Sequence, residues 1–400
     1  MEGYIVEWLN LLLRWFHVIV AIAWIGESFH FVAVDNSLTP PADEDSRRQG
    51  VGGEYWCVHG GGFYQFRKFK IAPKALPGAL HWSFIPSYST ALSGLTLIAV
   101  LYYWGADSYL IDRNVLDIPG WAGVLIGIGF LAGGWLVYDF LCRSPLGRDD
   151  RLLGIAVAAY CAVAAFALCH VFSGRGAFLH FGGMLALIMS ANVFFVIIPG
   201  QKKMVAQQLA GRTPDPAPGL RGKQRSVHNT YFTLPVLFAM LSNHYAFLYG
   251  AEWNWLVLLA IAVAGALIRH FFVMRHRGQR QWWAIAVGLA LLAGVFAALQ
   301  PPPPKQIAGV SSAELFARAE RVVNARCVQC HAARPSAQFG FPAPPKGIAL
   351  DTPALLRANA QGVYQQAVVA KAMPLGNLTA ITDEERHQLA QWFEAGAPMN

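Results

Sequence analysis

The sequence is poor in charge. Charged residues make up 14% of its 400 residues, whereas hydrophobic residues make up 55%. A composition this apolar excludes an ordinary soluble enzyme and is typical of a chain that crosses a membrane several times. The first apolar run is long and has no small-residue cleavage site, so we expect an uncleaved span rather than a signal peptide.

Cysteine is also scarce. Six cysteines in a chain of this length do not make a disulfide framework. Four of them lie in or beside apolar segments, where cysteine behaves as a small buried hydrophobic residue: Cys57, Cys142, Cys161 and Cys169. The remaining pair, Cys327 and Cys330, stands in a polar part of the chain.

Long apolar runs dominate the first three quarters of the chain. Each is about 20 residues long, the length that crosses a bilayer as a helix. Trp and Tyr cluster at their ends, as expected for residues that anchor at the membrane interface. We predict an all-α, polytopic membrane bundle of eight transmembrane helices over residues 1–299, with spans near 10–34, 82–104, 121–141, 152–172, 177–199, 232–248, 253–274 and 282–299.

The chain has a net charge of +8, and its Lys and Arg residues are distributed as the predicted topology requires. The first, third, fifth and seventh connections carry six, three, six and three Lys or Arg residues, whereas the even connections carry at most one each. Positive loops stay in the cytoplasm, so the N-terminus should be periplasmic. This distribution accounts for the basic balance without a nucleic-acid partner and predicts a bacterial inner-membrane protein in contact with lipid.

The composition changes sharply after residue 299. Residues 301–304 are all proline, which predicts a stiff linker over 300–306. Residues 307–400 should form a small periplasmic domain of the class I mono-haem cytochrome c type. Ser311 and Thr382 each stand three residues before a Glu, a spacing that predicts helices from Ser311 to the cysteine pair and from Thr382 to about Ala395.

Residues 327–331 carry the most specific motif, Cys-Val-Gln-Cys-His. Two thiols at this spacing can form thioethers to haem, and the adjacent His331 then ligates the iron. A zinc or redox C-x-x-C pair is the alternative. Met373, followed by Pro374 in a loop downstream, is our candidate for the second axial ligand, since a thioether raises the haem potential. The motif therefore predicts one covalent haem c, attached outside the cytoplasm.

Histidines in the apolar spans suggest further cofactors, because ionisable residues are costly there. His17, His170, His180 and His244 fall in or near the periplasmic half of the predicted bundle. Such a layer could ligate one or two haem b groups, or consist of hydrogen-bonded core and interfacial histidines. Glu27 lies deep in the first span, where a carboxylate can act in proton transfer, contact a substrate or simply pair with a neighbour such as His30.

The first connection is long and contains His59-Gly60-Gly61-Gly62-Phe63-Tyr64 followed by basic residues. Loops of this length are usually functional or disordered. We expect an ordered loop packed on the bundle. Its imidazole, backbone amides and cations could serve an anionic substrate, which makes His59 a candidate base and Gly61 and Arg67 candidate contacts, with Trp24 on the first span. A tight structural loop is the alternative. The fifth connection, 200–230, is expected to be a mobile loop.

The whole chain resembles the bacterial membrane-bound urate oxidases (urate hydroxylases) that end in a cytochrome c. The resemblance lies in residues 11–38, in the His59 to Tyr64 run, in the residues from Ala72 to Trp82 and in the order of spans and haem motif. His17 with residues 24–26 looks more loosely like the haem-binding region of bacterial membrane protoporphyrinogen oxidases, where the matching His binds haem.

The resemblance implies an oxidoreductase of purine catabolism that converts urate to 5-hydroxyisourate without forming hydrogen peroxide. Electrons would pass to haem c and then to a respiratory cytochrome or terminal oxidase. Urate entering from the cytoplasm would require redox centres across about 30 Å of hydrocarbon, whereas urate entering from the periplasm would not. An alternative function is a membrane electron-transfer subunit that passes electrons from quinol or a partner dehydrogenase to haem c.

Overall fold

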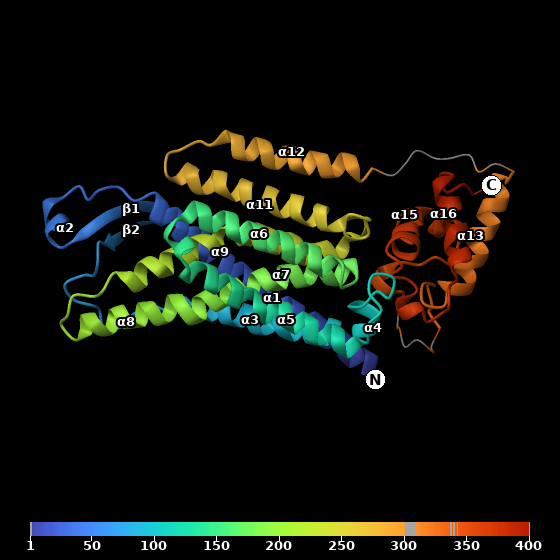
Figure 1. Ribbon diagram of the computed structural model, residues 1–400, viewed down its shortest axis with the longest axis horizontal. Helices are drawn as coiled ribbons and strands as arrows, with labels where there is room; N and C mark the ends of the chain where they lie inside the picture. Colours follow the sequence, from blue (N-terminus) through green and yellow to red (C-terminus); the bar gives the residue numbers. More distant parts are fainter. Residues whose placement is uncertain are drawn as a thin grey trace.

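The computed structural model describes residues 2–300, 307, 309–336, 338, 341 and 343–399. The molecule is elongated, with a β-hairpin at one end, a bundle of long helices in the middle and a small helical domain at the other end (Figure 1). We call these two ends of the bundle the hairpin end and the domain end. Residues 301–306 of the predicted linker lie outside the described part of the chain.

The bundle consists of long, mostly apolar helices, several of which continue directly from one helical segment into the next. Its segments are α1 (Glu2–Asn36), α3 (Ile85–Ile98), η1 (Ala99–Tyr103), α5 (Gly120–Arg143), α6 (Asp150–Cys169), α7 (Gly174–Ala191), η3 (Asn192–Ile197), α8 (Ile198–Leu209), α9 (Ala217–Leu241), α11 (Asn254–His276) and α12 (Trp282–Ala298). Short segments at the domain end are α4 (Ala106–Tyr109), η4 (Ser242–His244) and α10 (Ala246–Tyr249).

Six helical stretches of the described chain are long and apolar enough to cross a membrane. They are Trp8–Asn36, Ile85–Tyr103, Gly120–Arg143, Asp150–Cys169, Gly174–Leu209 and Asn254–His276. Helix α12 is apolar but has 17 residues, and α9 carries basic residues in its first half. Both run alongside the other helices (Figure 1). Six candidate spans are therefore supported, and the count of eight stays a prediction.

Helix α7 is the centre of the bundle core. Its residues from Gly176 to Leu185 are all buried. Glycines let the neighbouring helices approach closely: Cβ atoms placed on Gly182 and Gly183 would meet Ala239 of α9 at 2.6 Å and Leu131 of α5 at 3.2 Å. Close backbone approach through small residues is the usual way in which membrane helices pack.

The first connection folds as a β-hairpin, which the all-α prediction did not include. Strands β1 (Val51–His59) and β2 (Gly62–Phe69) pair antiparallel, with His59 opposite Gly62. Gly60 and Gly61 form the two-residue turn at φ 57° and 82°, a conformation that glycine adopts without strain. The short helix α2 (Glu44–Arg48) precedes the hairpin. The Gly-Gly pair flanked by aromatic residues was the pattern that could have predicted this fold.

The fifth connection is helical, so the expectation of a mobile loop over 200–230 was wrong. Helix α8 extends to Leu209 and α9 begins at Ala217. The sequence from Gln201 to Leu209 is rich in strong helix formers. Pro218 lies in the first turn of α9, where proline is tolerated because the first amide groups lack partners in any case.

The C-terminal domain has its own hydrophobic core. Its segments are α13 (Ser312–Arg326), η6 (Pro345–Gly347), α14 (Pro353–Ala358), α15 (Ala360–Val363), η7 (Tyr364–Val369), η8 (Leu375–Asn377) and α16 (Asp383–Glu394). Leu315 and Val322 of α13 share this core with Leu389 and the fully buried Trp392 of α16. The predicted helix starts are confirmed, since Ser311 caps α13 and Thr382 forms a capping box with Glu385.

A buried ion pair joins α5 to α9 near the hairpin end. Arg225 Nη2 lies 2.6 Å from Asp139 Oδ1, and the Arg225 and Asp139 side chains are 5% and 11% exposed. Asn192 Oδ1 lies 3.4 Å from Arg225 Nη1, and Tyr138 presents its ring to the guanidinium. The second Asp139 oxygen pairs with Arg143, which is 69% exposed. One carboxylate thus has both a buried and an exposed partner.

Asp139→Ala should lower the free energy of unfolding by about 3–5 kcal/mol, because it leaves the Arg225 charge buried without its partner. Arg143→Ala is the matched control and should cost less than about 1 kcal/mol, since exposed pairs contribute little. Denaturant unfolding of the purified protein in detergent micelles measures both. Equal losses for the two variants would contradict the assignment of Arg225 as the buried partner.

Candidate functional site

The Cys-Val-Gln-Cys-His run forms a tight turn directly after α13. The helix ends at Arg326, and Cys327 is its C-cap. The amide of His331 donates to the carbonyl of Cys327 at 2.8 Å, and that of Cys330 donates to the same oxygen at 3.1 Å. The turn therefore gathers both thiols and the imidazole at one end of α13, and neither cysteine forms a disulfide.

His331 is held in one orientation. Its Nδ1 lies 2.9 Å from the carbonyl oxygen of Ile348. Because a carbonyl only accepts, Nδ1 must carry the proton, and Nε2 keeps its lone pair. A backbone carbonyl on the far nitrogen is the usual way in which proteins fix the tautomer of a metal-binding histidine. The arrangement suits His331 as an iron ligand.

Met373 is fixed from two sides. The Met373 amide donates to the carbonyl of Gln366 at 3.0 Å. Arg386 Nη1 donates to the carbonyl of Met373 at 2.9 Å. Arg386 belongs to α16, is 8% exposed and also donates to the carbonyl of Ala367. Two thiols, an imidazole with a free Nε2 and a thioether residue with an anchored backbone are the kinds of donor that haem c uses.

Burial favours the neutral thiol form of both cysteines in the absence of a bound metal. Burial, reinforced by the neighbouring Cys330, raises the pKa of Cys327 to about 12 and outweighs the opposite effect of Arg386. Burial also raises the pKa of Cys330. Within the described part of the chain, no group of three or more His, Cys, Asp or Glu residues forms a metal site.

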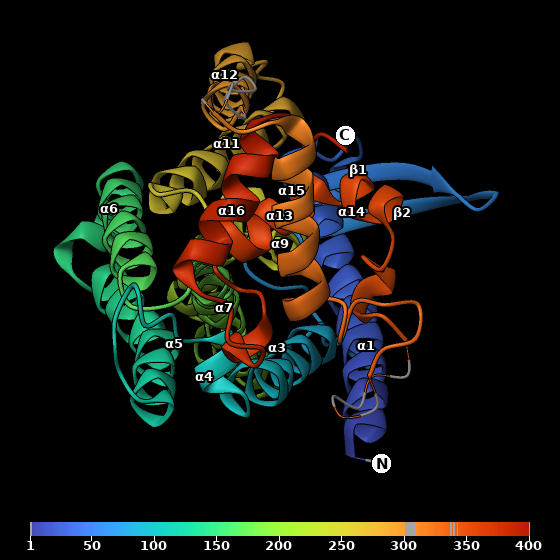
Figure 2. The same cartoon turned by 90° about the vertical axis from the view of Figure 1, so that its right-hand side faces the viewer.

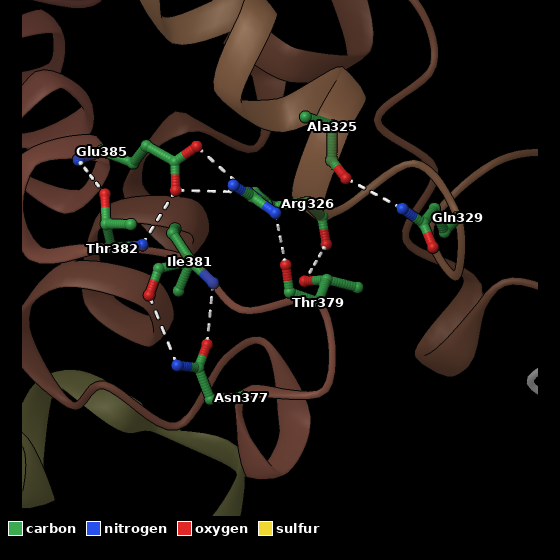
Figure 3. A network of polar contacts seen from close by, with 8 residues as sticks. All are labelled: Ala325, Arg326, Gln329, Asn377, Thr379, Ile381, Thr382 and Glu385. Atoms are coloured by element: carbon green, nitrogen blue, oxygen red, sulfur yellow. Dashed lines mark hydrogen bonds and ion pairs between the residues drawn. The ribbon is translucent and has the colours of Figure 1, made fainter.

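A polar network fixes the residue before the cysteine turn (Figure 3). Arg326 Nε lies 3.0 Å from Glu385 Oε1, and its Nη1 donates to the carbonyl of Thr379 at 2.7 Å. Thr379 Oγ1 donates to the carbonyl of Arg326 at 2.8 Å. Glu385 also accepts the amide of Thr382 at 2.8 Å. The start of α16 is thereby tied to the end of α13.

Glu385→Gln should destabilise the C-terminal domain by about 1–2 kcal/mol at pH 7. Burial raises the pKa of Glu385, but the Thr382 amide and the Arg326 guanidinium outweigh this effect and lower it overall. Because the pKa of Glu385 is lower in the folded state, its carboxylate stabilises the fold to its full extent above the unfolded-state pKa of about 4.3. The contribution is lost as the pH falls through the folded-state pKa.

Amide hydrogen exchange of α16 in the full chain, measured between pH 7 and 3, reports this dependence. The wild-type advantage over Glu385→Gln should shrink below about pH 4.3. Glu384→Gln, on the exposed side of the same helix turn, is the control and should keep the wild-type profile. An undiminished advantage at pH 3 would count against the ion pair as its source.

The C-terminal domain contacts the domain end of the bundle. Gln366 Nε2 donates to Tyr249 Oη at 3.4 Å. A Cβ placed on Gly250 would meet Val369 at 3.3 Å and Ala370 at 3.5 Å, and Ala370 packs against the bundle core. Figure 2 shows the domain in front of this end of the bundle. The segment that anchors Met373 is thus also the one that contacts the membrane-type helices.

The four predicted haem b ligands do not share one site. His180 on α7 is fully buried, with Nδ1 2.8 Å from the carbonyl of Gly176 and Nε2 3.1 Å from Tyr103 Oη. Both of its ring nitrogens have partners, so this conformation leaves none for iron. His170 is exposed and stacks on Phe166 at 4.0 Å, and His244 is exposed in η4.

His17 retains a nitrogen for a ligand. Its Nδ1 lies 2.9 Å from Ser93 Oγ on α3. Ser93 uses its own proton toward the carbonyl of Ser89 at 2.6 Å, so Nδ1 of His17 is the donor and Nε2 keeps a lone pair. A haem b in the bundle stays a prediction, and His17 is the member of the set whose chemistry suits it best.

The remaining candidates lie toward the hairpin end. Glu27 is half-buried on α1 and accepts a hydrogen bond from Ser83, and Trp24 lies one turn earlier. His59 and Gly61 stand at the exposed tip of the hairpin, while Arg67 pairs with Glu54 across the strands at 3.5 Å. No described hydrogen bond or ion pair joins His59 to Glu27, and the hairpin extends sideways from the helices (Figure 2).

A bundle with six helices that are long and apolar enough to cross a membrane, joined to a small helical domain with a C-x-x-C-H turn, is compatible with a membrane protein that carries a helical module. Residues 3–300 match the family described as urate oxidase N-terminal, and the chain belongs to this family. The match covers the bundle and hairpin and stops before the C-terminal domain. No curated protein and no solved structure matches the chain.

Proposed function

We propose that this protein is a membrane-bound urate oxidase whose C-terminal domain carries a covalent haem c. The family match over residues 3–300 carries the proposal, and the donor set of Cys327, Cys330, His331 and Met373 supports the electron-accepting half. The reaction is urate plus water to 5-hydroxyisourate, two protons and two electrons. No hydrogen peroxide forms, because oxygen is not the oxidant.

Several residues of the C-terminal domain would hold the haem. Cys327 and Cys330 would attach it through thioethers, and His331 through Nε2 and Met373 through its sulfur would ligate its iron. A haem c bound there would supply a one-electron acceptor of raised potential. Arg386 keeps the Met373 backbone in place, since its guanidinium bonds the carbonyls of Met373 and Ala367.

We place the protein in the bacterial inner membrane, with the N-terminus and the C-terminal domain in the periplasm. Haem c attachment outside the cytoplasm supports this orientation, and so does the clustering of Lys and Arg in the connections at the hairpin end. The start of α1 lies at the domain end of the bundle (Figure 1). A respiratory cytochrome or terminal oxidase in the periplasm or membrane would then take the electrons onward.

Anaerobic addition of urate to the purified, oxidised protein should reduce the haem c absorption band, with two haems reduced per urate consumed. Xanthine is the matched control ligand and should leave the band oxidised. A protein reduced by quinol but not by urate would instead be an electron-transfer subunit, and the proposal would fall.

Cys327→Ser combined with Cys330→Ser should abolish the haem c signal in a pyridine haemochrome spectrum, since both thioethers are lost. Cys142→Ser combined with Cys161→Ser should retain it, because these thiols lie in the bundle. The same spectrum tests for haem b. A b-type signal beside haem c in the wild-type spectrum supports a haem in the bundle, whereas a wild-type spectrum of haem c alone contradicts it.

Met373→Ala should lower the midpoint potential of haem c, because the soft thioether ligand that raises it is removed. Met399→Ala near the end of the chain is the matched control and should leave the potential unchanged. Potentiometric titration measures both. An unchanged potential in Met373→Ala would assign the sixth position to another residue.

A further inference from the structure

A polar group lies at the domain end of the bundle and has no part in the contacts described above. Arg175 Nε donates to Tyr102 Oη at 3.1 Å and to Asn243 Oδ1 at 3.3 Å, and Tyr102 Oη donates to Asn243 Oδ1 at 2.5 Å. The Arg175 guanidinium carbon also lies 5.6 Å from the ring centre of Tyr102 and 5.4 Å from that of Tyr109. We call Tyr102, Tyr109, Arg175 and Asn243 the junction cluster.

Arg175 is oriented but not neutralised. No described carboxylate comes within 4.0 Å of it, and its two Nη groups have no hydrogen-bond partner in the described chain. Arg175 also occupies the first turn of α7, where the helix dipole is positive and disfavours a cation. The arrangement fixes Nε and the plane of the guanidinium while it leaves the outer edge open.

Further cations approach the junction cluster from other segments. Burial lowers the pKa of Lys346 in the C-terminal domain, and the charges of Arg175 and Arg14 lower it further. Three cationic side chains from α1, α7 and η6 therefore share one region of positive potential, which an anion would relieve.

The backbone conformation at Tyr102 is also unusual. Tyr102 lies in η1, a π-helical segment that interrupts the end of the α3 helix. Such segments are rare and occur frequently at functional sites. On the other side of the junction, Lys346 stands two residues before Ile348, whose carbonyl holds His331. The junction cluster therefore lies between the family-matched bundle and the loop that orients the proposed iron ligand.

We propose that the junction cluster binds the substrate as a planar oxopurine monoanion. Arg175 would pair with the anionic edge through its two Nη groups, as guanidinium groups do with planar anions. The Asn243 amide nitrogen would donate to a purine carbonyl, the Tyr102 hydroxyl would keep Asn243 and Arg175 in place, and the half-buried Tyr109 ring would lie against the purine. This inference rests on the proposed urate oxidation and adds the position of the site, beside the C-terminal domain rather than at the hairpin.

Equilibrium binding of radiolabelled urate to the purified, fully oxidised protein and to its pre-reduced form tests the proposal. Because the pre-reduced form cannot turn over, binding is separated from chemistry. Arg175→Gln should raise the Kd for urate roughly 10- to 100-fold, as expected for the loss of a charge-assisted pair. Arg175→Lys should recover only part of the affinity, since lysine keeps the charge but not the bidentate edge.

The matched control is Arg113→Gln, an exposed arginine near the same end that pairs with Asp117 at 3.9 Å. It should leave the Kd unchanged. Thermal unfolding verifies that each variant is folded, and Arg14→Gln provides a second, milder test that should raise the Kd less than Arg175→Gln does.

Three outcomes overturn the inference. One is an unchanged Kd in both Arg175→Gln and Arg14→Gln. Another is a shifted haem midpoint potential with unchanged urate binding, which would assign the cations to the haem propionates. The third is weaker binding in a hairpin variant such as His59→Ala but not in Arg175→Gln. If wild type binds and oxidises urate in any of these cases, the proposed function stands and only the site moves.

Discussion

The burial of α7 is the constraint on which the bundle depends. This helix packs against α3, α5, α6 and α9, so each of these neighbours is positioned by it. Gly182 and Gly183 allow the close approach, and a side chain at either position would push α9 or α5 away. The same helix carries Arg175 at one end and runs through η3 into α8 at the other. Packing at its middle therefore sets the geometry at both ends of the molecule.

Features that depend on residues close to one another in the sequence were predictable. Apolar stretches of bilayer length gave six of the candidate spans, and serine and threonine caps gave the starts of α13 and α16 because a cap acts within one turn. Cys327, Cys330 and His331 lie together for the same reason, since they are neighbours in the chain, and the haem at this turn stays a prediction. The hairpin was missed because its Gly60-Gly61 turn was weighed as a ligand-binding loop and not as a strand connection.

Features assembled from distant segments were not predictable. The junction cluster joins positions 102, 109, 175 and 243, and no spacing in one sequence brings these together. Arg175 is the only Lys or Arg in the fourth predicted connection, so in the sequence it served only as evidence for the predicted topology. The role of His180 was equally hidden, because its partners are the carbonyl of Gly176 one turn away and Tyr103 from another helix. A buried histidine and a haem ligand are identical in sequence.

The position of the substrate decides what the bundle must do. A site at the hairpin end would place the purine a full bundle length, about 30 Å, from the C-terminal domain, and electrons would then need carriers among the helices. A site at the junction cluster places the purine beside the loop of Ile348 and His331. His180, whose two ring nitrogens are already bonded, is then explained as a core residue that supports Tyr103 next to Tyr102. On this account the helices serve mainly to hold Arg175, Asn243 and the tyrosines beneath the domain, and any haem b at His17 would serve electron exit to the membrane rather than the oxidation itself.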